Sequence, residues 1–274
     1  MTRISVEHLS IDFPLYHGES RSLKKTVFAA AAGRRLGQDG RKRLVVQAVR
    51  DVDFELHSGD RLGLIGANGA GKSTLLRTLA GIYEPSGGRI TIEGALSALL
   101  DASQGMNPDL TGRENIRLRG LYSGLRPQQI EQLEQDVAQF AELDDFINLP
   151  VRIYSSGMVV RLGFALATAI RPQILLMDEW ILAGDAAFMG RARARLESMV
   201  QGAEILVLST HAPDVVMQWC NRVIWLEGGR VRADGTPHEI LQQYLPSEQF
   251  AQAAMALAAR TKREADGMAN QQAA

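Results

Sequence analysis

Short apolar segments alternate along the chain with longer stretches of helical periodicity. Alternation of apolar and polar residues predicts strands at residues 3–9 and 52–56. Five further short segments read as strands, at residues 61–65, 89–93, 174–177, 205–208 and 223–226. Because apolar strands separated by helices favour a parallel sheet covered on both faces, the pattern predicts the α/β class.

The middle of the chain has the spacing of helices. Residues 113–170 read as mostly helical, and Pro127 suits the first turn of one of these helices. Apolar residues recur in that helix every three or four positions, at Ile130, Leu133, Val137 and Phe140. Such spacing more often indicates a core than a function. We therefore expect a helical insert to interrupt the α/β core.

A long insert separates the first two predicted strands. Between residues 19 and 43 it carries two acidic residues, Glu19 and Asp39, against eight basic ones. The basic residues are Arg21, Lys24, Lys25, Arg34, Arg35, Arg41, Lys42 and Arg43. Residues 22–32 have the pattern of a short amphipathic helix. Contact with an anionic membrane surface or a lipid phosphate is one interpretation of this insert, and a solvated loop is the other.

Composition describes an ordinary globular chain. It has 274 residues, 46% of them hydrophobic, and a net charge of −1, which gives no global argument for nucleic-acid binding. The single cysteine, Cys220, excludes an internal disulfide framework. No run of 18 uncharged apolar residues and no apolar leader is present, so we expect a cytoplasmic protein that can still work at a membrane. Residues 248–274, rich in Ala and Gln, are expected to form a helix that frays into a disordered tail.

One glycine-rich stretch carries the clearest chemistry. Residues 66–73 read Gly-Ala-Asn-Gly-Ala-Gly-Lys-Ser, between an apolar strand and a helical segment that begins near Thr74. This order is the context of a phosphate-binding P-loop, whereas an incidental glycine turn would need neither neighbour. Glycines let backbone N–H groups surround an anion, and the helix adds its positive end. Nucleotide-binding residues are thus expected at Gly66, Asn68, Gly69, Ala70, Gly71, Lys72, Ser73 and Thr74.

Two further segments complete a candidate active site. The apolar strand at residues 174–177 leads into Asp178 and Glu179. In P-loop enzymes an aspartate there supports Mg²⁺, together with the Ser73 hydroxyl, and the next glutamate can orient or deprotonate water. His211 follows the neighbouring strand, at the edge of the sheet where ligands bind, and is a candidate sensor of the γ-phosphate. A lone histidine is otherwise more often structural.

A second helix start provides another positive end. Residues 154–158 read Tyr-Ser-Ser-Gly-Met and precede an apolar helical stretch. Ser155 or Ser156 is expected to cap this helix, which leaves N–H groups near Gly157 for an anion. Taken alone, the segment predicts only a well-capped helix.

Together these segments resemble the ATP-binding cassette of ABC transporters, over about residues 1–245. The resemblance implies that residues 66–73 are Walker A, 174–178 Walker B with Glu179 as the catalytic glutamate, 154–158 the signature motif and His211 the switch histidine. It further implies that Asp185 lies in the D-loop and that Phe13, with Tyr16 as the second candidate, stacks on adenine. The Q-loop glutamine, a further aid to Mg²⁺ binding, is replaced by Asp101 or displaced to Gln104, and the sequence leaves both alternatives open.

Within that family, the variant signature and residues 178–188 look like subunits that export lipid-linked polysaccharides such as O-antigen, capsule or teichoic acid. The resemblance implies a RecA-like P-loop core with an antiparallel β-subdomain and a helical subdomain at about residues 95–165, the whole spanning residues 1–246. The remaining residues, 247–274, would be a tail without a glycan-binding domain.

The resemblance also implies ATP and Mg²⁺ as ligands and a homodimer in which Ser155, Ser156 and Gly157 of one chain face the P-loop of the other. A separate integral-membrane permease of ABC-2 type would then place the subunit at the cytoplasmic face of the inner membrane. An ABC ATPase with another cargo, or with a soluble non-transport role, is the alternative, and nucleic acid is not an expected partner.

Overall fold

The computed structural model describes residues 2–15, 36–38, 44–100, 105–178, 186–255, 257 and 258. The basic helix predicted at residues 22–32 and most of the predicted tail lie outside these ranges. The chain forms two compact units. The first comprises residues 1–94, 176–179 and 204–274, and the second comprises residues 95–175 and 180–203. No helix in the described ranges has both the length and the apolarity that a membrane span requires.

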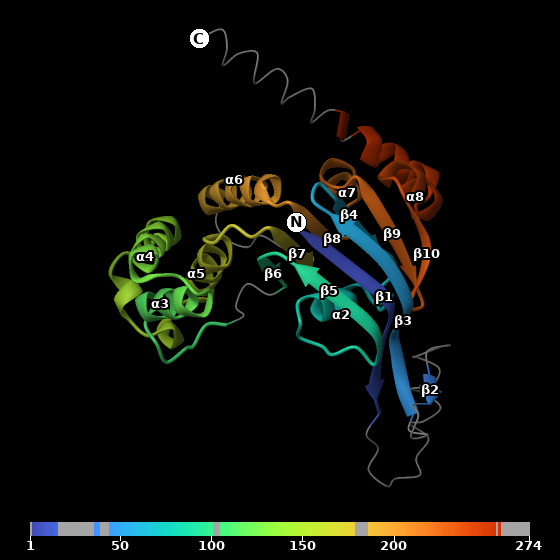
Figure 1. Cartoon of the computed structure of the whole chain (residues 1–274). Coiled ribbons are helices and arrows are strands. Elements are labelled where there is room, and N and C mark those ends of the chain that lie inside the picture. Colours follow the sequence, from blue (N-terminus) through green and yellow to red (C-terminus); the bar gives the residue numbers. More distant parts are fainter. Residues whose placement is uncertain are drawn as a thin grey trace, which may run out of the picture. The chain divides into compact units, whose positions relative to one another are not determined.

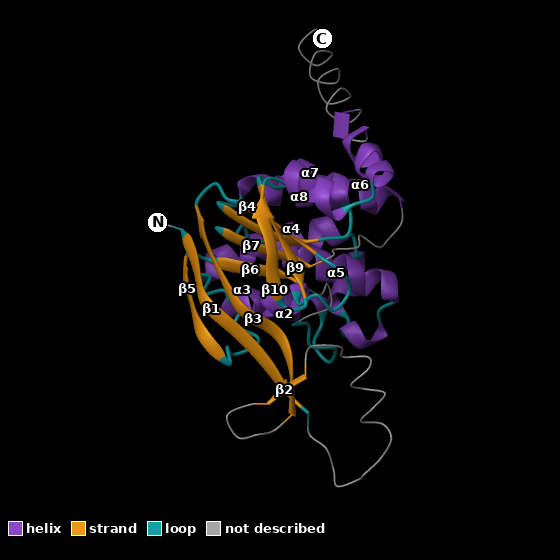
Figure 2. Cartoon of the chain, turned by 90° about the vertical axis from the view of Figure 1, so that its right-hand side faces the viewer, coloured by secondary structure: helices purple, strands orange, loops and turns teal. Residues whose placement is uncertain are grey.

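An antiparallel sheet forms one layer of the first unit, as the resemblance implied. It contains β1 (Arg3–Pro14), β2 (Leu36–Gln38), β3 (Leu44–His57) and β5 (Gly87–Glu93), in the order β2-β3-β1-β5. Both predicted strands at its centre extend beyond their expected ends, and β1 lies alongside β3 and β5 in Figures 1 and 2. Four apolar residues of β1, namely Ile4, Val6, Leu9 and Ile11, are at most 2% exposed, so this sheet contributes to the hydrophobic core.

A second sheet carries the P-loop strand. Its order is β10-β9-β4-β8-β7-β6, with β4 at Arg61–Ile65, β6 at Leu96–Leu99, β7 at Ile174–Asp178, β8 at Ile205–Ser209, β9 at Arg222–Glu227 and β10 at Arg230–Gly235. Strand β4 pairs in parallel with β8 and with β9, which confirms the parallel arrangement predicted for these strands. Strand β10 is antiparallel to β9. The two strands join through Gly228 and Gly229, whose φ angles of 60° and 82° suit a tight hairpin turn.

The helices of the first unit follow these strands. They include α2 (Lys72–Leu79), α7 (Pro213–Trp219) and α8 (Pro237–Tyr244). Residues 247–255 are helical as well, in line with the helix predicted to begin at residue 248. Helix α8 begins with a capping box between Thr236 and Glu239 and packs on β9 and β10. Cys220, at the end of α7, is a buried free thiol, and burial raises its pKa to about 12.

The second unit is mainly helical. It contains α3 (Gly112–Tyr122), α4 (Pro127–Ala141), two 3-10 turns (Asp144–Asn148 and Val151–Ile153), α5 (Ser156–Thr168) and α6 (Ala186–Gly202). Leu133 and Val137 of the predicted apolar stripe are buried, and Phe140 packs partly buried against the same core. Phe140 also meets the rings of Phe164 and Phe188, each at 5.7 Å between centroids. The helical periodicity thus correctly predicted a core.

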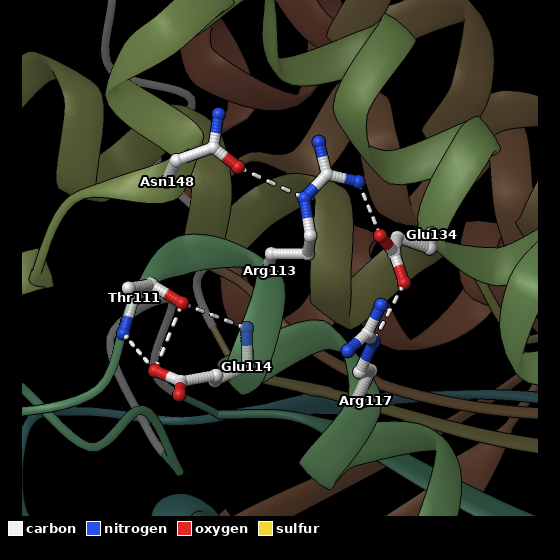
Figure 3. Close-up of polar contacts among 6 residues, drawn as sticks. All are labelled: Thr111, Arg113, Glu114, Arg117, Glu134 and Asn148. Carbon is white, nitrogen blue, oxygen red and sulfur yellow. Dashed lines mark hydrogen bonds and ion pairs between the residues drawn. The ribbon is translucent and has the colours of Figure 1, made fainter.

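A buried carboxylate joins two helices of this unit (Figure 3). Glu134 of α4, 8% exposed, accepts hydrogen bonds from Arg113 and Arg117 of α3. Arg113 also donates to Asn148 at 3.0 Å. Burial alone would raise the pKa of Glu134, but the hydrogen bonds from the two guanidinium groups outweigh it and lower the pKa. Glu134 is therefore held ionised between two cations.

Candidate functional site

A cavity of about 320 Å³ lies within the first unit, at the P-loop. It is lined by Phe13, Val46, Ala48, Asn68, Gly69, Ala70, Gly71, Lys72, Ser73, Thr74, Asp178, Ser209 and His211. Residues from β1, β3, the P-loop, β7 and the end of β8 therefore meet at one place. Of the predicted P-loop residues, all but Gly66 line this cavity, and Gly66 lies on a smaller one shared with His211.

Glycines shape the loop because side chains would collide there. At Gly66, where φ is 143°, a Cβ atom would lie 2.2 Å from the carbonyl oxygen of Leu226. At Gly71, where φ is 110°, it would lie 2.6 Å from the carbonyl oxygen of Ala48. Both positions combine a left-handed backbone with close approach of another strand, so glycine is required at each. The loop is thus held tightly against β9 and β3.

The P-loop also presents a helix end suited to an anion. Helix α2 starts at Lys72 without a side-chain cap and with no acidic residue in its first turn. Its first N–H groups and positive end therefore face a cavity that can accept phosphate. Lys72 is only 6% exposed, and its Nζ donates to the carbonyl oxygen of Gly66 at 2.7 Å. This hydrogen bond holds the Lys72 ammonium group against the P-loop, where a bound phosphate would lie.

The turn between β9 and β10, far from the P-loop in sequence, forms hydrogen bonds with both the P-loop and β3. The N–H of Gly229 donates to the carbonyl oxygen of Ala70 at 3.1 Å, and the Gly229 carbonyl accepts from the N–H of Arg50 at 2.7 Å. A Cβ atom on Gly229 would lie 2.8 Å from the Ala48 carbonyl oxygen. This contact could not be predicted from the sequence, because a Gly-Gly dipeptide indicates a turn but not which residues the turn contacts.

Side chains with oxygen and imidazole groups also line the cavity. Asp178 ends β7, and His211 follows β8, where the Thr210 hydroxyl accepts a hydrogen bond from the N–H of Ala212 at 3.1 Å. Ser73 and Asp178 line the same cavity. A hydroxyl and a carboxylate are the oxygen donors that Mg²⁺ prefers, so the donor set fits this ion. Ser209, which also lines the cavity, was not among the predicted residues.

The aromatic wall of the cavity comes from Phe13. The Phe13 ring lies with Val46 and Ala48 on the lining, as expected for a residue that stacks on a base. Tyr83 meets this ring edge to face. The second candidate for stacking, Tyr16, lies outside the described residues.

The signature segment forms the start of α5. Ser155 is its N-cap, and the Ser155 Oγ accepts a hydrogen bond from the N–H of Met158 at 3.3 Å. This decides between the two serines that the sequence left open. Ser156 and Gly157 are exposed in the first turn, so the positive helix end is accessible. Four other predicted site residues, Asp101, Gln104, Glu179 and Asp185, lie outside the described residues.

Known proteins with similar sequences match most of the chain. The family described as ABC transporter matches residues 49–182. An O-antigen export system ATP-binding protein, RfbE of Yersinia enterocolitica, is 42% identical over 84% of this chain and 97% of its own length. A Klebsiella pneumoniae protein of the same description, RfbB, is 36% identical over 88% and 96%. The teichoic acids export ATP-binding protein TagH of Listeria monocytogenes is 35% identical over 88% and 69%.

Solved structures agree on the fold. A structure described as the ATP-binding subunit of an ABC transporter superposes with a TM-score of 0.65 at 24% identity, covering 93% of this chain and 99% of that one. The ATP-binding cassette MJ0796, bound to ADP and Pi, gives 0.62 at 19% identity, covering 85% and 98%. The fold, the P-loop cavity and the sequence similarity agree. The chain belongs to the ABC transporter family and is one of its ATPases.

Proposed function

We propose that this ATPase is the motor subunit that drives export of a lipid-linked polysaccharide through a separate integral-membrane permease of ABC-2 type. The observation that carries the proposal is the 42% identity to an O-antigen export ATP-binding protein along 97% of that protein. A teichoic acids export protein among the relatives supports the same cargo class, since both names denote cell-surface glycan polymers. The subunit acts at the cytoplasmic face of the membrane and has no membrane-spanning helix among its described residues.

The predicted site residues have separate roles in ATP binding and hydrolysis. The P-loop N–H groups and Lys72 bind the ATP phosphates, and Phe13 stacks on adenine. Ser73 and Asp178 hold Mg²⁺, whose charge supports the transferring phosphoryl group when it is bound. Glu179 accepts a proton from the attacking water, and His211 senses the γ-phosphate. These roles together favour in-line attack by water on a fixed nucleotide.

Two copies of the chain close over two ATP molecules in the proposed cycle. Each site combines the P-loop of one copy with the start of α5 from the other, where Ser155, Ser156 and Gly157 offer N–H groups to the γ-phosphate. The exposure of Ser156 and Gly157 supports this role, because a partner can reach them. Closure moves the permease, and hydrolysis separates the copies again. Asp185 of the D-loop takes part in this contact.

The basic insert, residues 19–43, binds anionic groups at the membrane surface in this proposal. Its eight basic residues between residues 19 and 43 suit the phosphates of a lipid carrier or of an anionic leaflet. In the cell, the insert thus brings the motor close to lipid-linked cargo. Its neutralisation weakens export more than the ATPase activity of the isolated subunit.

A Lys72→Ala strain tests the cargo. Lysine at this position serves ATP use, so the strain completes the polysaccharide but retains it inside on its carrier, which is measured by comparing surface and internal glycan. Normal surface glycan, with no second motor gene present, contradicts the export proposal.

Glu179→Gln tests the cycle: the purified variant should bind ATP without turnover and accumulate as a dimer with ATP. Wild-type turnover by that variant removes Glu179 from its role without affecting the cargo proposal.

A further inference from the structure

Strand β8 ends in a residue that differs from the rest of the strand. Its first four residues, Ile205 to Leu208, are apolar and at most 2% exposed. The fifth, Ser209, is equally buried at 0% exposed, yet its Oγ has no hydrogen-bond partner within the described residues. A buried hydroxyl without a partner destabilises a fold, and such groups in native proteins call for an explanation.

The position of Ser209 suggests that explanation. Of the buried, unpartnered side-chain atoms found in the described part of the chain, Ser209 Oγ is the one whose residue lines the P-loop cavity. Strand β8 lies between β4, which leads into the P-loop, and β7, which ends at Asp178. In the parallel register Ser209 stands opposite Leu64, one residue before β4 ends. Ser209 therefore lies at the edge of the sheet between the phosphate loop and the metal-binding carboxylate.

We propose that Ser209 is a further residue of the ATPase site, and that its hydroxyl obtains its hydrogen bonds from water held around bound Mg·ATP. A serine hydroxyl both donates and accepts, so it can orient a water molecule between the nucleotide and the protein. It carries no charge and adds little to phosphate affinity beside Lys72 and the P-loop N–H groups. Its effect therefore falls on hydrolysis more than on ATP binding.

The chemistry requires an oriented water. The water oxygen bonds to the γ-phosphorus while the bridging oxygen leaves with ADP, and the water proton passes to a carboxylate base. Ser209 forms no covalent bond in this step. Its part is to restrict the water, or the water next to it, to a productive orientation.

A pair of variants of equal shape isolates the hydroxyl. Threonine and valine are both β-branched and suit a strand, and they differ mainly in the hydroxyl. We expect Ser209→Val to lower kcat for ATP about tenfold, the size of one net hydrogen bond, with the KM for ATP within about twofold of wild type. Ser209→Thr should retain kcat to within about threefold. Without nucleotide, Ser209→Ala should melt no lower than wild type, because the hydroxyl lost has no partner and no atom is added to this fully buried position.

A matched control carries a buried hydroxyl with a structural bond. Thr168, 5% exposed, donates from Oγ1 to the carbonyl oxygen of Phe164 at 2.7 Å. Thr168→Val should lower the melting temperature and leave kcat unchanged, the opposite of Ser209→Ala. Wild-type kcat in Ser209→Val, or equal loss of kcat in the Thr and Val variants, overturns the proposal. Ser209→Ala, which removes only the oxygen, gives the same test if the valine variant does not fold.

Discussion

The ring of Tyr83 meets the ring of Phe13 edge to face, with 5.2 Å between centroids and 81° between planes. Phe13 lines the P-loop cavity, and Tyr83 lies in the segment after α2. Two hydrogen bonds fix this segment to β1: the N–H of Asp12 donates to Ser86 Oγ at 2.7 Å, and the N–H of Ser86 donates to the Ser10 carbonyl oxygen at 2.8 Å. The orientation of the Phe13 ring is thus set before nucleotide binds.

Removing the second ring should weaken ATP binding without slowing hydrolysis. An edge-to-face pair contributes about 0.5–1.5 kcal/mol, so Tyr83→Ala should raise the dissociation constant for ATP by about two- to tenfold. The kcat should stay near wild type, because Tyr83 does not line the cavity. Tyr83→Phe, which keeps the ring, is the control. Titration of both variants with a fluorescent ATP analogue measures the effect, and equal affinities would mean that Phe13 needs no support.

The hairpin turn offers a matched pair of glycines. Gly228 and Gly229 both have positive φ, so alanine at either costs about 1 kcal/mol in backbone strain. Only at Gly229 does the new Cβ atom also approach Ala48, whereas at Gly228 the nearest atom is an Arg50 nitrogen at 4.0 Å. Gly229→Ala should therefore displace the P-loop and weaken ATP binding, and Gly228→Ala should lower the melting temperature alone. Calorimetric titration and thermal unfolding of both variants make the comparison, and equal ATP affinities would show that the hairpin does not hold the loop.

The Glu134 network should stabilise the second unit in a pH-dependent way. Hydrogen bonds to charged groups contribute about 1.5–3 kcal/mol when buried, and Arg113 and Arg117 are 39% and 59% exposed. Because water screens the charges of these partly exposed arginines, the net contribution of their hydrogen bonds is smaller. Glu134→Gln should therefore lower the free energy of unfolding at pH 7 by about 1–2 kcal/mol. Because the folded-state pKa is lowered, the contribution is complete above the ordinary glutamate pKa and is lost as pH falls through the folded value.

Urea unfolding at neutral and acid pH measures this contribution. The difference between wild type and Glu134→Gln should be full near pH 7, begin to shrink below the ordinary glutamate pKa, and vanish once pH has fallen through the lowered folded-state pKa, where both chains carry a neutral side chain. Glu131→Gln is the control, because Glu131 lies on the same helix but is exposed. A difference that does not shrink at all as the pH is lowered to the acid limit of the folded state would indicate that packing, not charge, holds the two helices together.

The proposed dimer makes a prediction for the start of α5. A Cβ atom on Gly157 would meet only Ser155 Oγ, at 4.0 Å, so Gly157→Asp fits the chain itself, and an acid in a first helical turn is favourable. ATP affinity of the single chain should stay within about twofold of wild type. The added charge should repel the γ-phosphate bound by a partner and abolish dimerisation with ATP, measured by light scattering in a Glu179→Gln background. Gly190→Asp, exposed and without neighbours within 4 Å, should still dimerise.

Residues in linear motifs were predictable, because neighbours in sequence stay neighbours in space. The residues from Asn68 to Thr74 line one cavity, and Asp178 and His211 join them directly after strands that the apolar pattern predicted. Phe13 also lines this cavity, but it lies beyond the predicted end of the first strand and was named only by the family resemblance. The parallel pairing of β4 with β8 and β9 followed from the same pattern.

Contacts between distant segments were not predictable. Gly229 touches a loop about 160 positions earlier, and Tyr83 supports Phe13 across a turn; neither residue belongs to a motif. Ser209 escaped notice because a serine after four apolar residues reads as the end of a strand, and only its burial distinguishes it. The limits of the helical subdomain that the family resemblance implied, about residues 95–165, do not include residues 180–203, which belong to the same unit.

Cys220 has a practical consequence for experiments on the proposed cycle. Thiol reagents react with the thiolate, and a buried group with a pKa of about 12 supplies almost none at neutral pH. The native chain, with this single cysteine, is therefore a ready background for attaching spectroscopic probes without prior mutagenesis. A cysteine introduced at an exposed position, such as Tyr122→Cys, should take a maleimide label alone. Distances between labels on two copies could then be followed while ATP is consumed.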